Sequence, residues 1–129
     1  MIGLPSSVKI FIATEPTDMR RGFDGLSAIV RYWGEDVFSG HLFVFISRRG
    51  DRAKILTWDN GGFVLFYKRL EKGRFHMPWG GGRQPKIQVD SGQLAMLLEG
   101  IDVKKVKMPK KWTPSPQKGL LAIDKNIQL

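Results

Sequence analysis

The chain has 129 residues, 42% of them hydrophobic, which is enough for one compact domain with one core and excludes disorder throughout. It contains no cysteine, so disulfides and thiolate metal ligands are excluded and a reducing, cytoplasmic setting is expected. The formal net charge is +9, no apolar run approaches the roughly 20 residues of a membrane helix, and no signal peptide is visible. We therefore expect a soluble, basic protein with no membrane partner.

The first third of the chain predicts one strand followed by a helix. Residues 8–12 are alternating and β-branched, as in a strand, and residues 16–18 then break the pattern and offer N-caps. Residues 21–33 place five apolar side chains on one helical face: Phe23, Leu26, Ile29, Val30 and Trp33. Gly34 is expected to end this helix.

The middle of the chain predicts an antiparallel meander of three strands, at residues 41–47, 52–58 and 63–70. An Arg-Gly-Asp turn joins the first two strands. Asn60-Gly61 joins the next two and is the strongest short hairpin signal, because both residues tolerate positive φ.

The last part of the chain predicts a short strand at residues 85–89 and a second, shorter helix over residues 92–99, capped by Ser91 and ended by Gly100. Residues 104–118 mix lysines with prolines, which is typical of a linker or a mobile arm. The predicted fold is α+β: an antiparallel sheet of about 4–5 strands with one longer and one shorter helix packed on it. A single domain over residues 1–103 is expected, followed by a flexible basic arm over residues 104–129.

The register of the meander follows from two-residue turns at Gly50-Asp51 and Asn60-Gly61. One face then carries the cross-strand rows Phe43/Trp58/Phe63, Phe45/Leu56/Leu65, Ser47/Lys54/Tyr67 and Arg49/Arg52/Arg69, and the other face carries Arg48 and Lys68 in one row. Like charges directly opposite destabilise a sheet, so this row of three arginines favours a bound anion such as a phosphate backbone, with Tyr67 or Trp58 available for stacking. The alternative is that these cations extend into solvent and protect a sheet edge.

Basic charge is concentrated in the middle and the tail of the chain. Residues 1–47 carry four Lys/Arg against five Asp/Glu, residues 48–83 nine against three, and residues 84–129 eight against four. This asymmetry favours a polyanion partner, most simply nucleic acid, although charge that serves solubility alone is the alternative. DNA, RNA and an acidic protein stay open as partners. The candidate binding residues are Arg48, Arg49, Arg52, Lys54, Tyr67, Lys68, Arg69, Arg74, Lys104, Lys105, Lys107, Lys110 and Lys111.

No catalytic motif is apparent in the sequence. His41 and His76 have no nucleophile motif beside them, and the three glycines at residues 80–82 lack the lysine and hydroxyl of a phosphate-binding loop. The acids are scattered over cap and turn positions, at Asp18, Asp24, Asp51 and Asp59. We therefore expect no enzyme activity, no metal, no cofactor and no small-molecule substrate.

Several segments resemble the accessory protein TnpB of the insertion sequence 66 family, which is unrelated to the RNA-guided nuclease of that name. They are residues 1–5 (MIGLP), 17–26 (TDMRRGFDGL), 48–52 (RRGDR), 54–59 (KILTWD), 66–75 (FYKRLEKGRF) and 97–102 (LLEGID). The resemblance covers residues 1–103. In one departure, the family usually has Trp-Pro after Gly-x-Phe, whereas this chain has Met77-Pro78 followed by Trp79.

The resemblance implies a role in DNA transposition beside the transposase, which carries out the strand chemistry, and it carries over no catalytic residues. One hypothesis is an accessory protein that binds element ends or target DNA through the cationic sheet end and the lysine arm, without reading bases. A second is a protein adaptor that binds the transposase without contacting DNA, through exposed aromatics (Trp33, Trp79, Trp112) and the apolar tail at residues 120–129. A third, a nuclease using acids such as Asp18, Asp24 and Asp59, predicts metal-dependent DNA cleavage, and we expect none.

Overall fold

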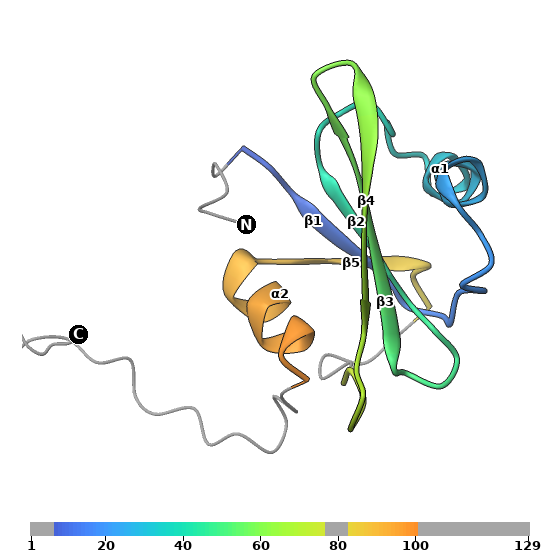
Figure 1. Cartoon of the computed structure of the whole chain (residues 1–129). Coiled ribbons are helices and arrows are strands. Elements are labelled where there is room, and N and C mark those ends of the chain that lie inside the picture. The colour runs from blue at the N-terminus through green and yellow to red at the C-terminus, as the bar shows by residue number, and fades with distance from the viewer. Residues whose placement is uncertain (1–6, 77–82, 101–129) are drawn as a thin grey trace, which may run out of the picture.

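The structure is a computed structural model that describes residues 7–76 and 83–100. Five strands form one sheet in the order β4-β3-β2-β1-β5. Their bounds are β1 Ile10–Ala13, β2 Leu42–Ile46, β3 Arg52–Asp59, β4 Gly62–Arg69 and β5 Lys86–Val89. Helices α1 (Phe23–Tyr32) and α2 (Ser91–Leu98) cover opposite faces of the sheet (Figure 1). The predicted α+β fold with a longer and a shorter helix is confirmed. Within the described ranges, no helix is long and apolar enough to cross a membrane.

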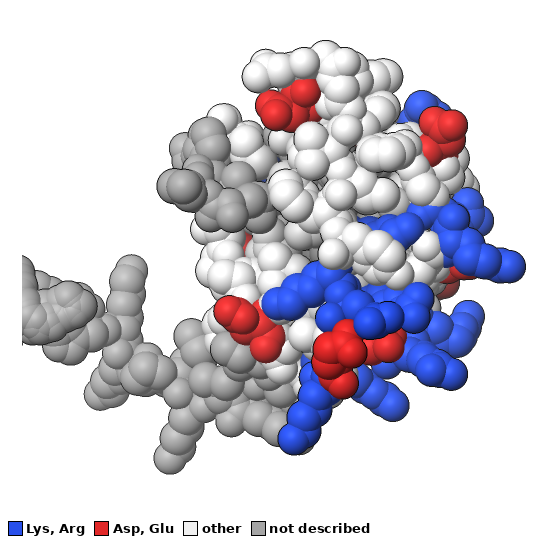
Figure 2. Space-filling model, viewed as in Figure 1, with Lys and Arg blue, Asp and Glu red and all other residues white. Residues whose placement is uncertain are grey.

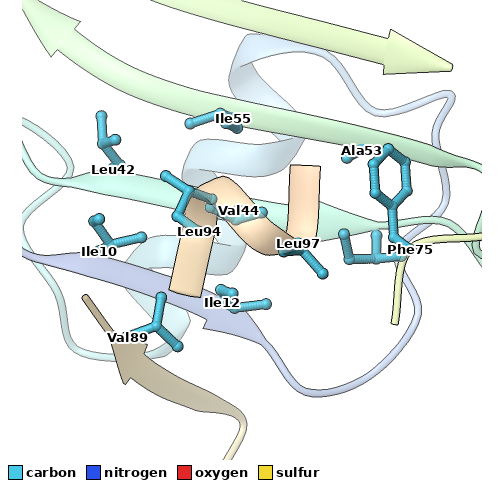
Figure 3. Close-up of a cluster of buried hydrophobic side chains, with 11 residues drawn as sticks. Ile10, Ile12, Leu42, Val44, Ala53, Ile55, Phe75, Val89, Leu94 and Leu97 are labelled. Atoms are coloured by element: carbon cyan, nitrogen blue, oxygen red, sulfur yellow. The ribbon is translucent and has the colours of Figure 1, made fainter. Parts of the chain in front are cut away.

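Alternation along the strands divides the core into two layers. On one face, Phe43 and Phe45 pack with Leu26 and Val30 of α1. On the other face, alternate strand residues meet α2 (Figure 3); this layer contains Ile10, Ile12, Leu42, Val44, Ile46, Ala53, Ile55, Phe75, Val89, Leu94 and Leu97. Because successive strand residues point to opposite faces, all five residues of the central strand β2 are buried.

The sheet is mixed, which corrects the expectation of a purely antiparallel sheet. β1 pairs with β2 in parallel, with Ile10 opposite Leu42, whereas the other three strand pairs are antiparallel. Parallel neighbours need a crossover of a dozen or more residues, and α1 supplies it here. A strand pattern carries no information about direction, so the sequence of β1 is compatible with either pairing.

Both helices begin at a different residue from the one predicted. α1 starts after Gly22, which makes no side-chain cap hydrogen bond, and Asp18 instead accepts from the backbone N–H of Arg20 at 2.9 Å. The N-cap of α2 is Asp90 rather than Ser91: Asp90 accepts from the backbone N–H of Gln93 at 2.7 Å, and the Gln93 side chain accepts from that of Asp90 at 2.9 Å. This reciprocal capping box satisfies two N–H groups that would otherwise lack partners.

The register of the meander is confirmed for one hairpin and wrong for the other. Between β3 and β4 it is as predicted, with Asn60 (φ 42°) and Gly61 (φ 89°) forming the turn. Between β2 and β3, Ser47 N donates to Arg52 O at 2.9 Å, so residues 48–51 form a four-residue connection and the register moves by two. A shift of two leaves every side chain on its predicted face, whereas a shift of one would reverse them all. Arg49 therefore lies in the turn and not opposite Arg52.

Candidate functional site

The candidate cations that the structure describes lie at one end of the sheet, distributed over both faces. Arg48 and Arg49 are exposed in the β2–β3 turn, and Arg74 is exposed after β4. The α1 face carries Arg52, Lys54, Tyr67 and Arg69, and the α2 face carries Lys68. Figure 2 shows Lys and Arg gathered over this end of the molecule. Lys104, Lys105, Lys107, Lys110 and Lys111 lie outside the described residues, together with the rest of the predicted arm.

We call Arg48, Arg49, Arg52, Arg69 and Arg74 the basic sheet end. Beside it, an open cleft of about 470 Å³ separates the loop at residues 16–19 from the β2–β3 turn. The cleft is lined by Pro16, Thr17, Asp18, Met19, Ser47, Arg48, Arg49, Asp51 and Arg52. The lining residues thus include three arginines and two aspartates, of which Asp18 lies in the loop and Asp51 in the turn beside Arg48 and Arg49.

Lys54 holds the wall of the cleft in place. Its Nζ donates to the carbonyl oxygens of Met19 and Arg21, each at 2.8 Å, and the residue is only 7% exposed. The loop is also tied to the end of β2, where Thr17 N donates to Ile46 O at 2.8 Å. Lys54 was predicted as a binding cation, but two of its three N–H donors are committed to the backbone. These two hydrogen bonds tie the loop to β3, and a binding role for Lys54 stays a prediction.

The two acids of the cleft, Asp18 and Asp51, each have a local partner. Arg20 forms an ion pair with Asp18 at 2.6 Å, and hydrogen bonds from the Arg20 side chain and backbone lower the pKa of Asp18 to about 2. Asp51 accepts from Ser47 Oγ at 3.2 Å. Arg48 and Arg49 make no ion pair with another described residue, and both are exposed. These two guanidinium groups are therefore available to an anion.

The predicted cross-strand row of three arginines contains only two arginines in the structure. Arg52 lies directly opposite Arg69, while Arg49 is displaced into the turn. Each of the pair has a local partner: Arg69 Nε contacts Glu71 at 2.8 Å, a hydrogen bond that raises the pKa of Arg69, and Arg52 Nη1 donates to Tyr67 Oη at 3.3 Å. Both contacts are at the surface, where such pairs stabilise little. Glu71 offsets the charge of Arg69, whereas the contact of Arg52 is with a neutral hydroxyl.

Lys68 and Arg74 have different surroundings on the far side of the turn. Lys68 Nζ donates to Leu98 O at 2.7 Å, at the C-terminal end of α2, where carbonyls lack helical partners. Arg74 lies against Gly50, and the next residue, Phe75, donates its N–H to Gly50 O at 2.6 Å. Lys68 thus fastens a helix to the sheet, whereas Arg74 adds an exposed cation beside Arg48 and Arg49.

Trp33 is not exposed in the way that the adaptor hypothesis predicted. It is half-buried, and its ring stacks on Phe45 with centroids 5.5 Å apart and tilts against Phe43 at 6.4 Å. Trp58 contacts Phe63 at the opposite end of the hairpin from the cations. Trp79, Trp112, the apolar tail at residues 120–129 and the altered Met77-Pro78 motif all fall outside the described residues.

Sequence reasoning treated residues 16–18 as a strand breaker with N-caps and did not include Thr17 or Met19, which line the cleft, among the candidate binding residues. The available signal was the resemblance itself, because residues 17–26 and 48–52 belong to two of the recognised segments. The structure brings these segments together across the cleft. The acids of the nuclease hypothesis are not gathered: within residues 7–76 and 83–100, no three His, Asp or Glu side chains are placed to hold a metal ion.

Comparison with known proteins places the chain in a family. Residues 8–108 match the family described as IS66 Orf2-like protein. The chain is 35% identical over 108 residues to the uncharacterized protein y4jC of Sinorhizobium fredii, covering 83% of this chain and 91% of that protein. It is 41% identical over 102 residues to the uncharacterized protein y4hO of the same organism, covering 77% and 87%. No solved structure matches it. The chain belongs to the IS66 Orf2-like family of insertion-sequence accessory proteins.

Proposed function

We propose that this protein serves transposition as an accessory that binds the phosphate backbone of DNA through the basic sheet end. The observation that carries the proposal is the pair of exposed guanidinium groups, Arg48 and Arg49, which have no ion pair with another described residue and line a cleft. The loop that forms the opposite wall of the cleft is part of a second segment resembling the family. Arg52, Arg69 and Arg74 extend the same positive end.

Arginines gathered at one end of a protein indicate phosphate binding rather than a role in solubility alone. Its planar fork donates two parallel hydrogen bonds to a phosphate, and such charge-assisted bonds are roughly twice as strong as neutral ones. Cations that serve solubility alone gain nothing from being gathered at one end, where they repel one another. The gathering of arginines beside a cleft therefore supports a polyanionic ligand, and membership in a transposition family makes DNA the simplest one.

The test compares two double variants with the same net charge. Arg48→Glu with Arg49→Glu removes the proposed contacts, while Lys9→Glu with Arg31→Glu changes two exposed cations elsewhere. Binding to a fluorescent duplex from an element end is followed by anisotropy at increasing salt. The log affinity of the wild type should fall by about 0.9 per phosphate contacted for each unit of log salt. The turn variant should lose at least about tenfold in affinity and about two units of salt slope. Equal losses in both variants, or no binding by the wild type, would refute the proposal.

The adaptor role is the second candidate, and the outer edge of β4 favours it. β4 ends the sheet and carries Phe66, which is 46% exposed on the α2 face. A strand from another protein could pair with this edge and cover the ring. Capture of purified transposase after nuclease treatment, lost on Phe66→Glu but retained by Arg48→Glu with Arg49→Glu, would favour the adaptor over the DNA-binding role.

A further inference from the structure

Tyr67 is a partly exposed aromatic side chain surrounded by cations. It lies on the α1 face in β4, 52% exposed, with the arginine pair Arg52 and Arg69 forming the next cross-strand row. Its own cross-strand partner is the buried Lys54. In a sheet, same-face neighbours of this kind are within reach of long side chains, so one ligand could touch the ring and the guanidinium groups together.

The Tyr67 ring is fixed without being buried. Lys54 Nζ lies 4.8 Å from the ring centroid, and this ammonium is itself fastened to Met19 O and Arg21 O. The phenol oxygen accepts from Arg52 Nη1 at 3.3 Å. The ring and the phenol oxygen thus have partners, and the residue is still 52% exposed. A ring ordered in this way loses little conformational entropy when a flat ligand stacks on it.

We infer that Tyr67 is a stacking platform for an unpaired base, so that the DNA bound at this end is single-stranded where it crosses the ring. In a duplex, base faces are covered by their neighbours, and only an unpaired or splayed base can stack on a side chain. Arg52 and Arg69 are placed to hold the adjoining phosphates, the combination that single-strand-binding surfaces use. The inference rests on the proposed function and names the form of its ligand.

Other exposed aromatics lack this setting. Tyr32 is 85% exposed on α1, with no cation over its ring among the described residues. Phe38 is 53% exposed but packs on Trp58 and Phe63 at the other end of the sheet. Tyr32 therefore serves as a matched control, since it is the other of the two tyrosines in the chain.

The experiment measures the affinity of the full chain for fluorescent oligo-thymidine and for a duplex of equal length. Tyr67→Ala should weaken oligo-thymidine binding by roughly 5- to 100-fold, the range for loss of one stacked base, and change duplex binding by less than about twofold. Tyr67→Phe keeps the ring and should stay within about twofold of the wild type on both ligands, as should Tyr32→Ala. A photoreactive oligonucleotide carrying 5-iododeoxyuridine should cross-link to Tyr67.

The outcomes separate this inference from the proposed function. If Tyr67→Ala leaves oligo-thymidine binding unchanged, or weakens both ligands equally, the stacking inference is wrong, and the duplex measurements on the Arg48 and Arg49 variant still decide the proposed function. If Tyr67→Phe is as weak as Tyr67→Ala, the phenol oxygen rather than the ring makes the contact, and the inference fails. If the wild type binds neither ligand, both proposals fall.

Discussion

The two ends of the β3–β4 hairpin show how one pair of strands can carry opposite chemistries. At the turn end, Trp58 and Phe63 lie opposite each other with ring centroids 5.0 Å apart, and Phe38 packs on both. At the open end, Arg52 lies opposite Arg69. The aromatic side chains at the turn end pack on one another. The two guanidinium groups at the open end repel each other and keep some of their N–H donors in solvent.

The difference between the two ends indicates that this small sheet can bind a ligand at its open end without disturbing the packing of its core. Aromatic cross-strand pairs stabilise a sheet, and like-charged pairs weaken it. Between the two ends, Leu56 is fully buried and Lys54 is tied to the backbone, so the transition from core to surface takes place within two or three rows. We therefore expect substitutions at the two ends to separate stability from DNA binding.

The largest effect on stability is expected at the turn end. Trp58→Ala removes a half-buried ring that contacts Phe38 and Phe63, and should lower the free energy of unfolding by about 3 kcal/mol. Urea denaturation measures this change, and anisotropy on the folded protein should give an unchanged DNA affinity. A parallel loss of affinity would mean that the two ends are not independent.

Lys54→Met tests the boundary between the ends. It removes two charge-assisted hydrogen bonds to Met19 O and Arg21 O while keeping the aliphatic stem, and should lower the free energy of unfolding by about 2 kcal/mol. Hydrogen exchange at the Thr17 amide, which bonds to Ile46 O, should accelerate as the loop loosens. Lys9→Met, at an exposed lysine, is the control and should change neither quantity. Unchanged exchange at Thr17 would show that Lys54 does not position the loop.

Arg52→Thr sharpens the contrast at the open end. It relieves the like-charge pair with Arg69 and introduces a β-branched residue, so the free energy of unfolding should rise by about 0.3 kcal/mol. DNA affinity should fall by about tenfold with the loss of one phosphate contact. Loss of stability in this variant would show that the Arg52 contact with Tyr67 outweighs the repulsion.

The smallest effect concerns Asp18 in the cleft wall. Its pKa is lowered to about 2, first by the side-chain hydrogen bond from Arg20 and then by that residue's backbone N–H. A lowered native pKa contributes stability above the ordinary value of 3.8, and this contribution is lost as the pH falls from about 4 toward 2. Carbonyl-detected NMR should report this pKa, and Arg20→Gln should return it toward 3.8. A titration near 3.8 in the wild type would contradict the pairing.

The sequence predicts the elements and the sheet faces well because those depend on local pattern. Asn60-Gly61 defines a turn that needs positive φ at both residues, so the β3–β4 register follows from it. Gly50, with φ 77°, is compatible with connections of different lengths, and the β2–β3 register was therefore wrong by two. The assignment of side chains to the two faces of the sheet was still correct, because side chains on one face recur every second residue.

The candidate site was predictable only in part, because it depends on contacts between distant segments. Arg48 and Arg49 follow from the charge run, and both are exposed. The burial of Lys54 depends on a loop more than thirty residues earlier, which local pattern cannot place over β3. Likewise, Asp18 lines the cleft only because β1 runs parallel to β2 and brings the following loop to the β2–β3 turn.

The position of β1 between partners that are distant in the chain governs the order in which the protein can be assembled. Ile10 lies opposite Leu42 on one side and Val89 on the other, whereas the β2–β3 and β3–β4 pairs are hairpins joined by short turns. A chain emerging from the ribosome can complete the meander early, but Ile10, Ile12 and Val44 stay uncovered until Leu94 and Leu97 have been synthesised. Closure of the α2 layer thus needs residues made after the meander, and we expect a chain that stops before α2 to leave one apolar face of the sheet bare.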